Sequence, residues 1–370
     1  MRKTLFLLLC ALLCAKAYSQ RCLGGDISLL PDYLKAGTVY RQPDGQPDSP
    51  YQIFKQAGWN TMRVRLFVHP ELAPQDNKDE GVCQDLPYVV ALCRDIKRHG
   101  FRLMLDFHYS DTWADPAKQY IPHAWAKALS GKNRQEQLRT LQDSVYAHTS
   151  HSLAVLKQNG IEPDYIQVGN EITFGMLWPV GKTTPDKNDN WEALSALLHS
   201  GISACRRICP SAKLIIHTEH AQDWTATRQY YERLRQAGTD YDIIGLSYYP
   251  MWHGTIAHLD GVLDSLKRFG KPVMIVETAF YYSHDNDPWE KDPEHYSDLY
   301  PVNAKGQAQF ADELVGMLSR HPEVQGLFWW FPEENQSGKP VIKNWINRGL
   351  FDNHTGRALP ALQALKGFVQ

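Results

Sequence analysis

The sequence has no excess of basic charge. Its 370 residues hold 39 Lys and Arg against 41 Asp and Glu, which gives a formal net charge of −2 at pH 7. A protein that binds nucleic acid through its phosphates needs clustered basic residues, so we exclude nucleic acid as a partner. The hydrophobic fraction of 43% and the charged fraction of 22% are those of an ordinary globular protein.

Long apolar runs are missing apart from one near the N-terminus. Two basic residues precede an apolar run over residues 5–13, and small residues follow it. This run is too short to span a bilayer and has the flanks of a secretory signal, so residues 1–19 are predicted to be a signal peptide. We expect residues 20–370 to be exported to the periplasm, the cell surface or the medium, without a membrane span. A lipid anchor at Cys14 is the alternative.

Cysteine is too scarce to build a disulfide framework. Five cysteines remain after the predicted signal peptide: Cys22, Cys83, Cys93, Cys205 and Cys209. An odd number cannot all pair, and a chain of this size does not need stapling. Cys205 and Cys209 lie one helical turn apart, but two thiols do not make a metal site, so we interpret them as buried or incidental.

Two catalytic signatures are also absent. Gly24-Gly25 after the first predicted strand is not the glycine-rich fingerprint of a dinucleotide or phosphate site. His217, Glu219 and His220 suggest zinc, but they lack the His-Glu-x-x-His spacing of a helical zinc site. On a strand the two histidines would also point to opposite faces. We therefore disfavour a metal hydrolase.

The chain alternates between apolar strands and amphipathic helices. Continuous apolar strands that alternate with helices indicate a parallel sheet, and eight units at this length favour a closed barrel over an open sheet. We predict an α/β fold with a single (β/α)8 TIM barrel, whose long βα loops form an active-site cleft, and a monomer. The strands are expected at residues 23–28, 61–68, 102–109, 165–169, 213–219, 242–250, 272–278 and 326–332.

Two of these strands deliver a glutamate at the C-terminal end. Asn170 and Glu171 follow the fourth strand, and Glu277 ends the seventh. All strand ends of a parallel barrel meet at the same rim, so the two carboxylates are predicted to face one cleft. Two carboxylates across a gap are the groups that cleave a glycosidic bond. The plainer alternative is that each glutamate marks a strand end in water.

The other strand ends carry hydrogen-bonding groups and aromatic rings. A sugar presents hydroxyls on its edge and C–H bonds on its faces, so this mixture fits a saccharide. One carboxylate must stay ionised, and a cation such as Arg65 would favour that state. Tyr249 shares a strand face with Ser247 and could hold Glu277, with Tyr248 as the alternative. The remaining groups are Asp26, His108, Asp111, Trp113, His217 and Trp330.

Five sequence blocks resemble glycoside hydrolase family 53, the arabinogalactan endo-β-1,4-galactanases. They lie at residues 25–28, 105–116, 167–171, 247–250 and 276–279, and the Asp-Phe-His-Tyr-Ser-Asp-Thr-Trp block within 106–113 is highly specific. The resemblance implies a retaining endo-hydrolase of β-1,4-galactan in which Glu171 is the acid/base and Glu277 the nucleophile. It spans almost the whole mature chain.

The same resemblance implies further site residues. Arg65, His108, Asn170, Tyr249 and Trp330 would line the cleavage subsite. A second set would reach neighbouring sugars or support the site, namely Asp26, Asp111, Trp113, His217, Asp223, Trp224 and Trp252. Two departures put the distal subsites in doubt. Phe331 stands where the family usually has Glu, and the loop over 217–224 lacks the usual Leu-Asp run.

Some members of that family bind calcium between the last loops. Asp285, Asn286 and Asp287 offer oxygen ligands after the seventh strand, although their spacing is not that of an EF-hand, and a solvated acidic loop is the alternative. No cofactor is expected to be required. Two other functions stay open: a related barrel acting on β-mannan, xylan or glucan, and a barrel that binds carbohydrate without cleaving it.

Overall fold

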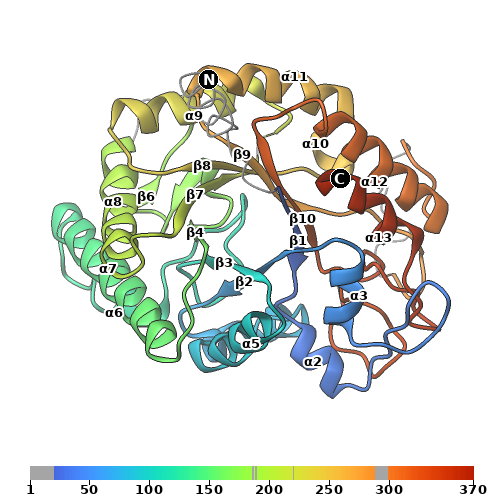
Figure 1. Ribbon diagram of the computed structural model, residues 1–370. Coiled ribbons are helices and arrows are strands. Elements are labelled where there is room, and N and C mark those ends of the chain that lie inside the picture. Colours follow the sequence, from blue (N-terminus) through green and yellow to red (C-terminus); the bar gives the residue numbers. More distant parts are fainter. Residues whose placement is uncertain (1–20, 186, 188–189, 220, 288–298) are drawn as a thin grey trace, which may run out of the picture.

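Eight parallel strands close into a barrel, as predicted. The computed structural model describes residues 21–185, 187, 190–219, 221–287 and 299–370, so the predicted signal peptide and His220 lie outside it. Neighbouring strands pair in the order β1-β10-β9-β8-β7-β4-β3-β2, and Figure 1 shows them surrounded by helices. The barrel strands are β1 (Cys22–Asp26), β2 (Thr61–Leu66), β3 (Arg102–Phe107), β4 (Tyr165–Val168), β7 (Lys213–Thr218), β8 (Ile243–Ser247), β9 (Val273–Thr278) and β10 (Val324–Trp330).

Helices cover the outside of the barrel. Each turns an apolar face inward, as α5 does with Val89, Val90, Cys93 and Ile96, and this spacing places one stripe of side chains against the strands. The helices are α2 (Leu30–Lys35), α3 (Pro50–Gln56), α4 (Gln75–Asp79), α5 (Leu86–Arg98), α6 (His123–Lys127), α7 (Arg134–Gln158), α8 (Trp191–Ile208), α9 (Trp224–Gln236), α10 (Pro250–His253), α11 (Ile256–Leu266), α12 (Ala304–Leu318) and α13 (Pro360–Ala364). No helix among the described residues has the length and apolar character that crossing a membrane requires.

The barrel interior is apolar at one end and polar at the other. Side chains two residues apart on a strand share a face, so Met104 and Asp106, or Ile215 and His217, point the same way. The apolar cluster consists of Cys22, Met104, Tyr165, Ile215, Ile243, Met274, Val276 and Phe328. One step further along the strands stand Arg63, Asp106, Gln167 and His217, all nearly fully buried. Because the strands are parallel, these polar groups gather at the C-terminal rim.

The structure adds short elements that the sequence did not reveal. Helix α2 lies in a segment expected to be a polar loop, and β10 begins two residues earlier than expected, at Val324. The loop after β4 contains the 3₁₀ helix η2 (Ile172–Phe174) and a hairpin of β5 (Gly175–Met176) and β6 (Gly181–Lys182). All five described cysteines are free thiols, and Cys205 and Cys209 are buried.

Candidate active site

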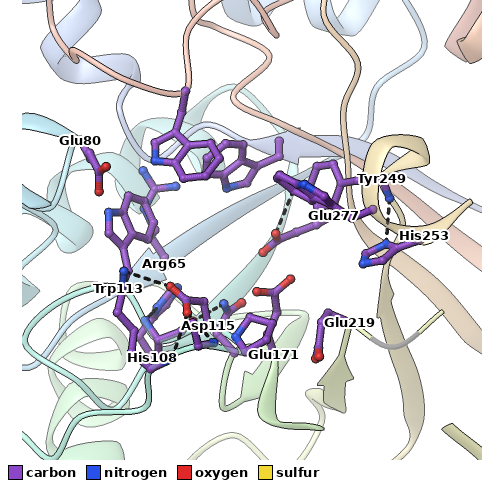
Figure 2. A pocket seen from close by; sticks show the side chains of 18 of the residues that line it. Arg65, Glu80, His108, Trp113, Asp115, Glu171, Glu219, Tyr249, His253 and Glu277 are labelled. Atoms are coloured by element: carbon purple, nitrogen blue, oxygen red, sulfur yellow. Dashed lines mark hydrogen bonds and ion pairs between the residues drawn. The ribbon is translucent and has the colours of Figure 1, made fainter. Parts of the chain in front are cut away.

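A cavity of about 500 Å³ opens at the C-terminal rim of the barrel. Loops after six different barrel strands line it, which is the common arrangement of active sites in this fold. Figure 2 shows Glu171 and Glu277 pointing toward one another near its centre, with Trp113 and Arg65 on one side and Glu219 on the other. The predicted site residues that line the cavity are Arg65, His108, Trp113, Asn170, Glu171, Tyr249, Trp252, Glu277 and Trp330.

Glu277 reaches the cavity because strand β9 is irregular at that point. Met274 and Val276 point into the apolar barrel interior, so strict alternation would turn Glu277 outward. The pairing of β8 with β9 shifts register between Leu246 and Ser247, and Ser247 lies opposite Glu277. An extra residue of this kind re-aims the side chains that follow it. Glu277 therefore faces the cleft.

Two donors fix the carboxylate of Glu277. The Arg63 Nη2 lies 2.7 Å from its Oε1, and the Tyr249 hydroxyl donates to its Oε2 over 3.0 Å. The prediction that Tyr249 holds Glu277 is confirmed. Tyr248, the alternative, is fully buried and donates to the backbone oxygen of Gly254. With an arginine on one oxygen and a hydroxyl on the other, the carboxyl group of Glu277 is held in a fixed orientation.

Glu171 is aimed by an unusual backbone conformation. Its φ of 48° and ψ of 51° lie in the left-handed region, which costs a non-glycine residue on the order of 1–3 kcal/mol. The backbone oxygens of Asn170 and Glu171 accept hydrogen bonds from the amide of Gln119, at 2.9 and 3.3 Å. The Ser247 hydroxyl donates to Glu171 Oε1 over 2.6 Å. Strain of this kind persists only where surrounding contacts hold it, and it points to a functional position.

Behind Glu171, a histidine orients the serine. His217 Nδ1 accepts from the backbone N–H of Glu171 at 3.3 Å and from the Gln167 amide at 2.9 Å, so its proton sits on Nε2. That Nε2–H donates to Ser247 Oγ over 2.8 Å. Burial, together with the charge of Arg63, holds the pKa of His217 well below its usual value. His217 is therefore neutral, and it fixes the direction in which Ser247 donates to Glu171.

The two carboxyl groups differ in the neighbouring charges, which either add to the effect of burial on the pKa or oppose it. Burial raises the pKa of Glu171 well above its usual value, and the negative charges of Glu277 and Glu219 raise it further. Burial also raises the pKa of Glu277, but the adjacent Arg63 opposes the rise. Of the two, Glu171 therefore keeps its proton to higher pH.

The expectation that Arg65 serves the carboxylate pair was wrong. Arg63 contacts Glu277, whereas Arg65 Nη1 pairs with Asp26 Oδ1 at 2.8 Å. Arg65 is packed between the rings of Trp113 and Phe331, 4.7 and 4.8 Å from their centroids. The two arginines do share a strand face, but the gap between the two glutamates lies nearer the first. Arg63 reaches across the barrel interior to Asp26, Asp106 and Glu277.

Several other predicted site residues do not line the cavity. Asp26 is fully buried between the two arginines, and Asp111 caps loop backbone by accepting from the N–H groups of His69 and His123. Asp223 is the N-cap of α9, and Trp224 packs beneath Arg268. Together with His217 and Tyr248, these residues support the site or lie away from it. The sequence could not distinguish an aspartate that caps backbone N–H groups from one that binds substrate, since both follow strands and both use the same side chain.

The structure brings in residues that sequence reasoning did not single out. Glu219, Gln222, His253, Trp345 and Arg348 line the cavity, and Ser247 contacts Glu171. Ser247 could have been found from its place two residues before Tyr249 on the same strand face. Trp345 and Arg348 lie in an irregular loop after β10, where no strand or helix period marks a direction.

The predicted metal residues have other partners where the structure describes them. Asp285 Oδ2 lies 3.1 Å from His354 Nε2, and its backbone oxygen accepts from Gln336 and Asn347. The Asn286 amide donates to Gln336. Donors and a histidine around the oxygens do not fit a hard cation, and no group of three or more His, Cys, Asp or Glu in the described ranges is placed to hold a metal ion. Calcium stays an untested prediction.

A closed barrel with two facing carboxyl groups in a saccharide-sized cleft is the architecture of a glycoside hydrolase. Comparison with known proteins gives the family. The pattern of "Glycosyl hydrolase family 53" matches residues 22–365. A Niallia circulans protein described as "Uncharacterized protein in bgaB 5'region" is 35% identical over 362 residues, 94% of each chain.

Two further relatives agree. An Aspergillus fumigatus protein described as a probable arabinogalactan endo-beta-1,4-galactanase A is 33% identical over 343 residues, 89% of each chain. The solved structure of the Ignisphaera aggregans GH53 catalytic domain has a TM-score of 0.82 at 29% identity, and the match covers 96% of this chain and 98% of that one. The chain belongs to glycosyl hydrolase family 53, as its motifs indicated.

Proposed function

We propose that the protein is an endo-acting, retaining galactanase that cleaves β-1,4-galactosidic bonds in galactan and type I arabinogalactan. The observation that carries the mechanism is the contrast between two buried carboxyl groups in one cleft. Arg63 touches Glu277 at 2.7 Å, whereas Glu171 is contacted by a neutral hydroxyl and lies in the field of other carboxylates. The substrate class rests on the family and on the named fungal relative.

In this mechanism Glu277 is the nucleophile. Arg63 and Tyr249 keep it ionised and oriented, so that one oxygen attacks the anomeric carbon and the bond to the leaving oxygen breaks. Glu171 holds its proton and donates it to that leaving oxygen. It then removes a proton from the water that hydrolyses the glycosyl-enzyme intermediate. Asn170, whose Oδ1 accepts from Arg63 over 2.9 Å, has a second amide N–H for a sugar hydroxyl.

Aromatic side chains supply the sugar platforms. Trp113 and Trp330 line the cavity with their ring centroids 6.2 Å apart, and Trp252 is 40% exposed at its rim. Flat rings that face C–H bonds, next to hydrogen-bond donors, suit a hexose chain. An open cleft along such platforms favours attack inside a chain over removal of terminal units.

A substrate screen tests the proposal. The purified protein is incubated with β-1,4-galactan, β-mannan, xylan and β-glucan, and products are followed over time. We expect activity on galactan with an early ladder of oligosaccharides, and NMR should show the β-anomer of the new reducing end first. Faster hydrolysis of another glycan, one short product throughout, or the α-anomer first would contradict the substrate, the endo mode or the retention respectively.

We also propose that residues 1–19 direct export and are removed. The basic start and the apolar run over 5–13 support this. N-terminal sequencing of the protein recovered from its natural host tests it. A start near residue 18 or 20 is expected, a lipid-modified Cys14 would favour the anchored alternative, and an intact Met1 would contradict export.

A further inference from the structure

Besides Arg63 and Arg65, a third arginine of the cleft is surrounded by aromatic rings. Arg348 lies in the loop after β10 and lines the same cavity as Glu277. Its guanidinium carbon is 4.6 Å from the ring centroid of Tyr281, 4.8 Å from Trp345, 5.4 Å from Trp330, 5.5 Å from Trp252 and 6.0 Å from Tyr249. Cation–π attraction to these faces places the guanidinium among the rings.

The hydrogen-bonding capacity of Arg348 is mostly unused. The residue is 1% exposed, and it forms no ion pair with any residue that the structure describes. Its Nη2 donates to the Tyr281 hydroxyl, while Nε has no acceptor. A guanidinium carries five N–H donors, and aromatic faces accept none of them strongly. Buried donors without acceptors are uncommon, and beside a binding cavity they indicate that a ligand supplies the missing oxygens.

The loop holds Arg348 in a fixed position. The Trp329 indole N–H donates to the Arg348 backbone oxygen over 2.7 Å, and the Gly349 N–H donates to the buried carboxylate of Glu334 over 3.2 Å. A Cβ on Gly349 would lie 1.7 Å from the Glu334 backbone oxygen, so only glycine fits there. Asn347 has a φ of 66° and donates to the Asp285 backbone oxygen. Such a pre-organised arginine loses little freedom on binding.

The position of Arg348 relative to the cleavage point follows from Tyr249. This side chain contacts Glu277 through its hydroxyl at 3.0 Å, and its ring faces Arg348 at 6.0 Å. Arg348 is thus one side chain removed from Glu277. Trp252, 40% exposed, and Trp345 flank it with ring centroids 6.3 Å apart. Indole faces and a guanidinium fork lie together, as a sugar with adjacent hydroxyls requires.

We propose that Arg348 is a substrate-binding residue that donates hydrogen bonds to hydroxyl oxygens of a neutral sugar unit held against Trp252 and Trp345, beside the cleavage point. The inference rests on the proposed function and deepens it. It adds a subsite for one unit of the chain and makes affinity, rather than the chemical step, depend on Arg348. A purely structural arginine would only pack the rings, and its loss would affect folding without affecting substrate length preference.

The test compares Arg348→Met with Arg348→Lys in the full chain. KM and kcat are measured on galacto-oligosaccharides of three to six units, and binding is measured by calorimetry in a Glu277→Gln background. For Arg348→Met we expect KM and Kd for the longest substrate to rise about tenfold or more, with kcat within about threefold. Arg348→Lys, which keeps the charge but not the fork, should recover part of the affinity.

Arg268→Met is the matched control, because Arg268 also stacks on an indole, that of Trp224, and does not line the cavity. It should leave KM unchanged. If Arg348→Met melts far below the parent, oligosaccharide binding is measured in Tyr281→Phe instead. This variant removes the protein acceptor of Arg348 and keeps the guanidinium. We expect its Kd to change by less than threefold.

Three results would overturn the inference. The first is unchanged oligosaccharide affinity in a folded Arg348→Met protein. The second is a fall in kcat at constant KM, since Arg348 would then act on Tyr249 and Glu277. The third is equal loss of affinity for all substrate lengths together with a large loss in Tyr281→Phe, which marks a structural role. If the parent enzyme does not cleave galactan, the proposed function is wrong. That result is distinct from the three results that would overturn the role of Arg348.

Discussion

Glu171 and Glu277 are the same amino acid in the same cleft, and both are buried, yet the charged and polar groups around them differ. Glu277 is in contact with a guanidinium and a phenol hydroxyl. Glu171 accepts one serine hydroxyl and lies near the charges of Glu277 and Glu219. Burial raises the pKa of both, but only Glu277 has a cation that opposes the rise. The neighbours, not the residue type, distinguish the proposed acid from the proposed nucleophile.

The comparison also shows how the fold produces that difference. Arg63 stands on β2, inside the barrel, and reaches Glu277 across its width. Ser247 and His217 stand on β8 and β7, nearer Glu171. Each strand contributes one or two interior side chains at the rim, so the positions of eight strand ends determine which charge meets which carboxyl group.

The largest effect is expected from Glu277→Gln. Loss of the attacking oxygen should lower kcat on galactan by about 10⁴-fold or more, as removal of a nucleophile does elsewhere. The amide oxygen can still accept from Arg63 and the amide nitrogen can donate to the Tyr249 hydroxyl oxygen, so the circular dichroism spectrum should match the parent. Steady-state kinetics with a reducing-sugar assay measure the loss, and turnover near the parental rate would refute the nucleophile assignment.

Glu171→Gln should lower kcat on galactan by about 10²–10⁴-fold, the usual contribution of a general acid. The loss should be much smaller for formation of the glycosyl-enzyme from a galactoside with a dinitrophenolate leaving group, which needs no protonation. Comparing pre-steady-state bursts on the two substrates measures this. Equal losses on both substrates would mean that Glu171 does not protonate the leaving group.

The same variant changes stability with a definite sign. A folded-state pKa raised above the unfolded value of about 4.3 means that folding retains a proton that the unfolded chain releases. Stability from this group is present at low pH and is lost as pH rises toward the folded pKa. Gln carries no such proton. Glu171→Gln should therefore melt at the same temperature as the parent at pH 4 and above it at pH 8, by calorimetry.

Arg63→Lys tests the contact with a guanidinium that distinguishes Glu277 from Glu171. A lysine cannot contact Asp26, Asp106 and Glu277 together as the planar fork does. We expect kcat to fall about 10- to 100-fold. The acid limb of the kcat/KM profile should move to higher pH, because an ammonium that cannot contact all three carboxylates opposes the raised pKa of Glu277 less than the guanidinium does. Arg65→Lys, which alters a pair with Asp26 only, should move that limb less. An equal shift in both variants would contradict a specific role for Arg63.

The barrel was predictable from the sequence because most of its strands are apolar runs followed by polar residues. The rim residues that end a strand, Glu171 and Glu277, were predictable for the same reason. The choice between Arg63 and Arg65 was not, because both share one strand face and the sequence does not say how far a side chain reaches across the barrel. The register shift at Ser247 that turns Glu277 inward also leaves no trace in residue type.

Site residues in loops were the hardest to predict from the sequence. Asp111 and Asp223 follow strands, as a binding residue would, but they accept hydrogen bonds from backbone N–H groups. Arg348 was not predicted, because its loop after β10 follows no helical or strand period. Its direction is set by contacts with Trp329 and Glu334 that join distant parts of the chain. Long-range contacts of this kind are visible only in the folded structure.

The smallest effects come from a pair of variants around Glu171 that should act in opposite directions. In Ser247→Ala the carboxylate loses a donor that lowers its pKa, so the pKa rises and the basic limb of the pH–rate profile moves to higher pH. In Glu219→Gln a negative charge that raises the same pKa is removed, so that limb moves to lower pH.

Both variants should keep kcat at the optimum within about tenfold, because Glu171 is protonated there and one hydrogen bond between neutral groups contributes only about 0.5–1.5 kcal/mol. Each is therefore a control for the other: general damage to the cleft would lower both rates without moving the limbs apart. The limbs are measured by kcat/KM on a soluble oligosaccharide across pH 4 to 9. Since the acid limb belongs to Glu277, it should stay in place in both variants. A shift of the acid limb with a fixed basic limb would exchange the roles of the two glutamates.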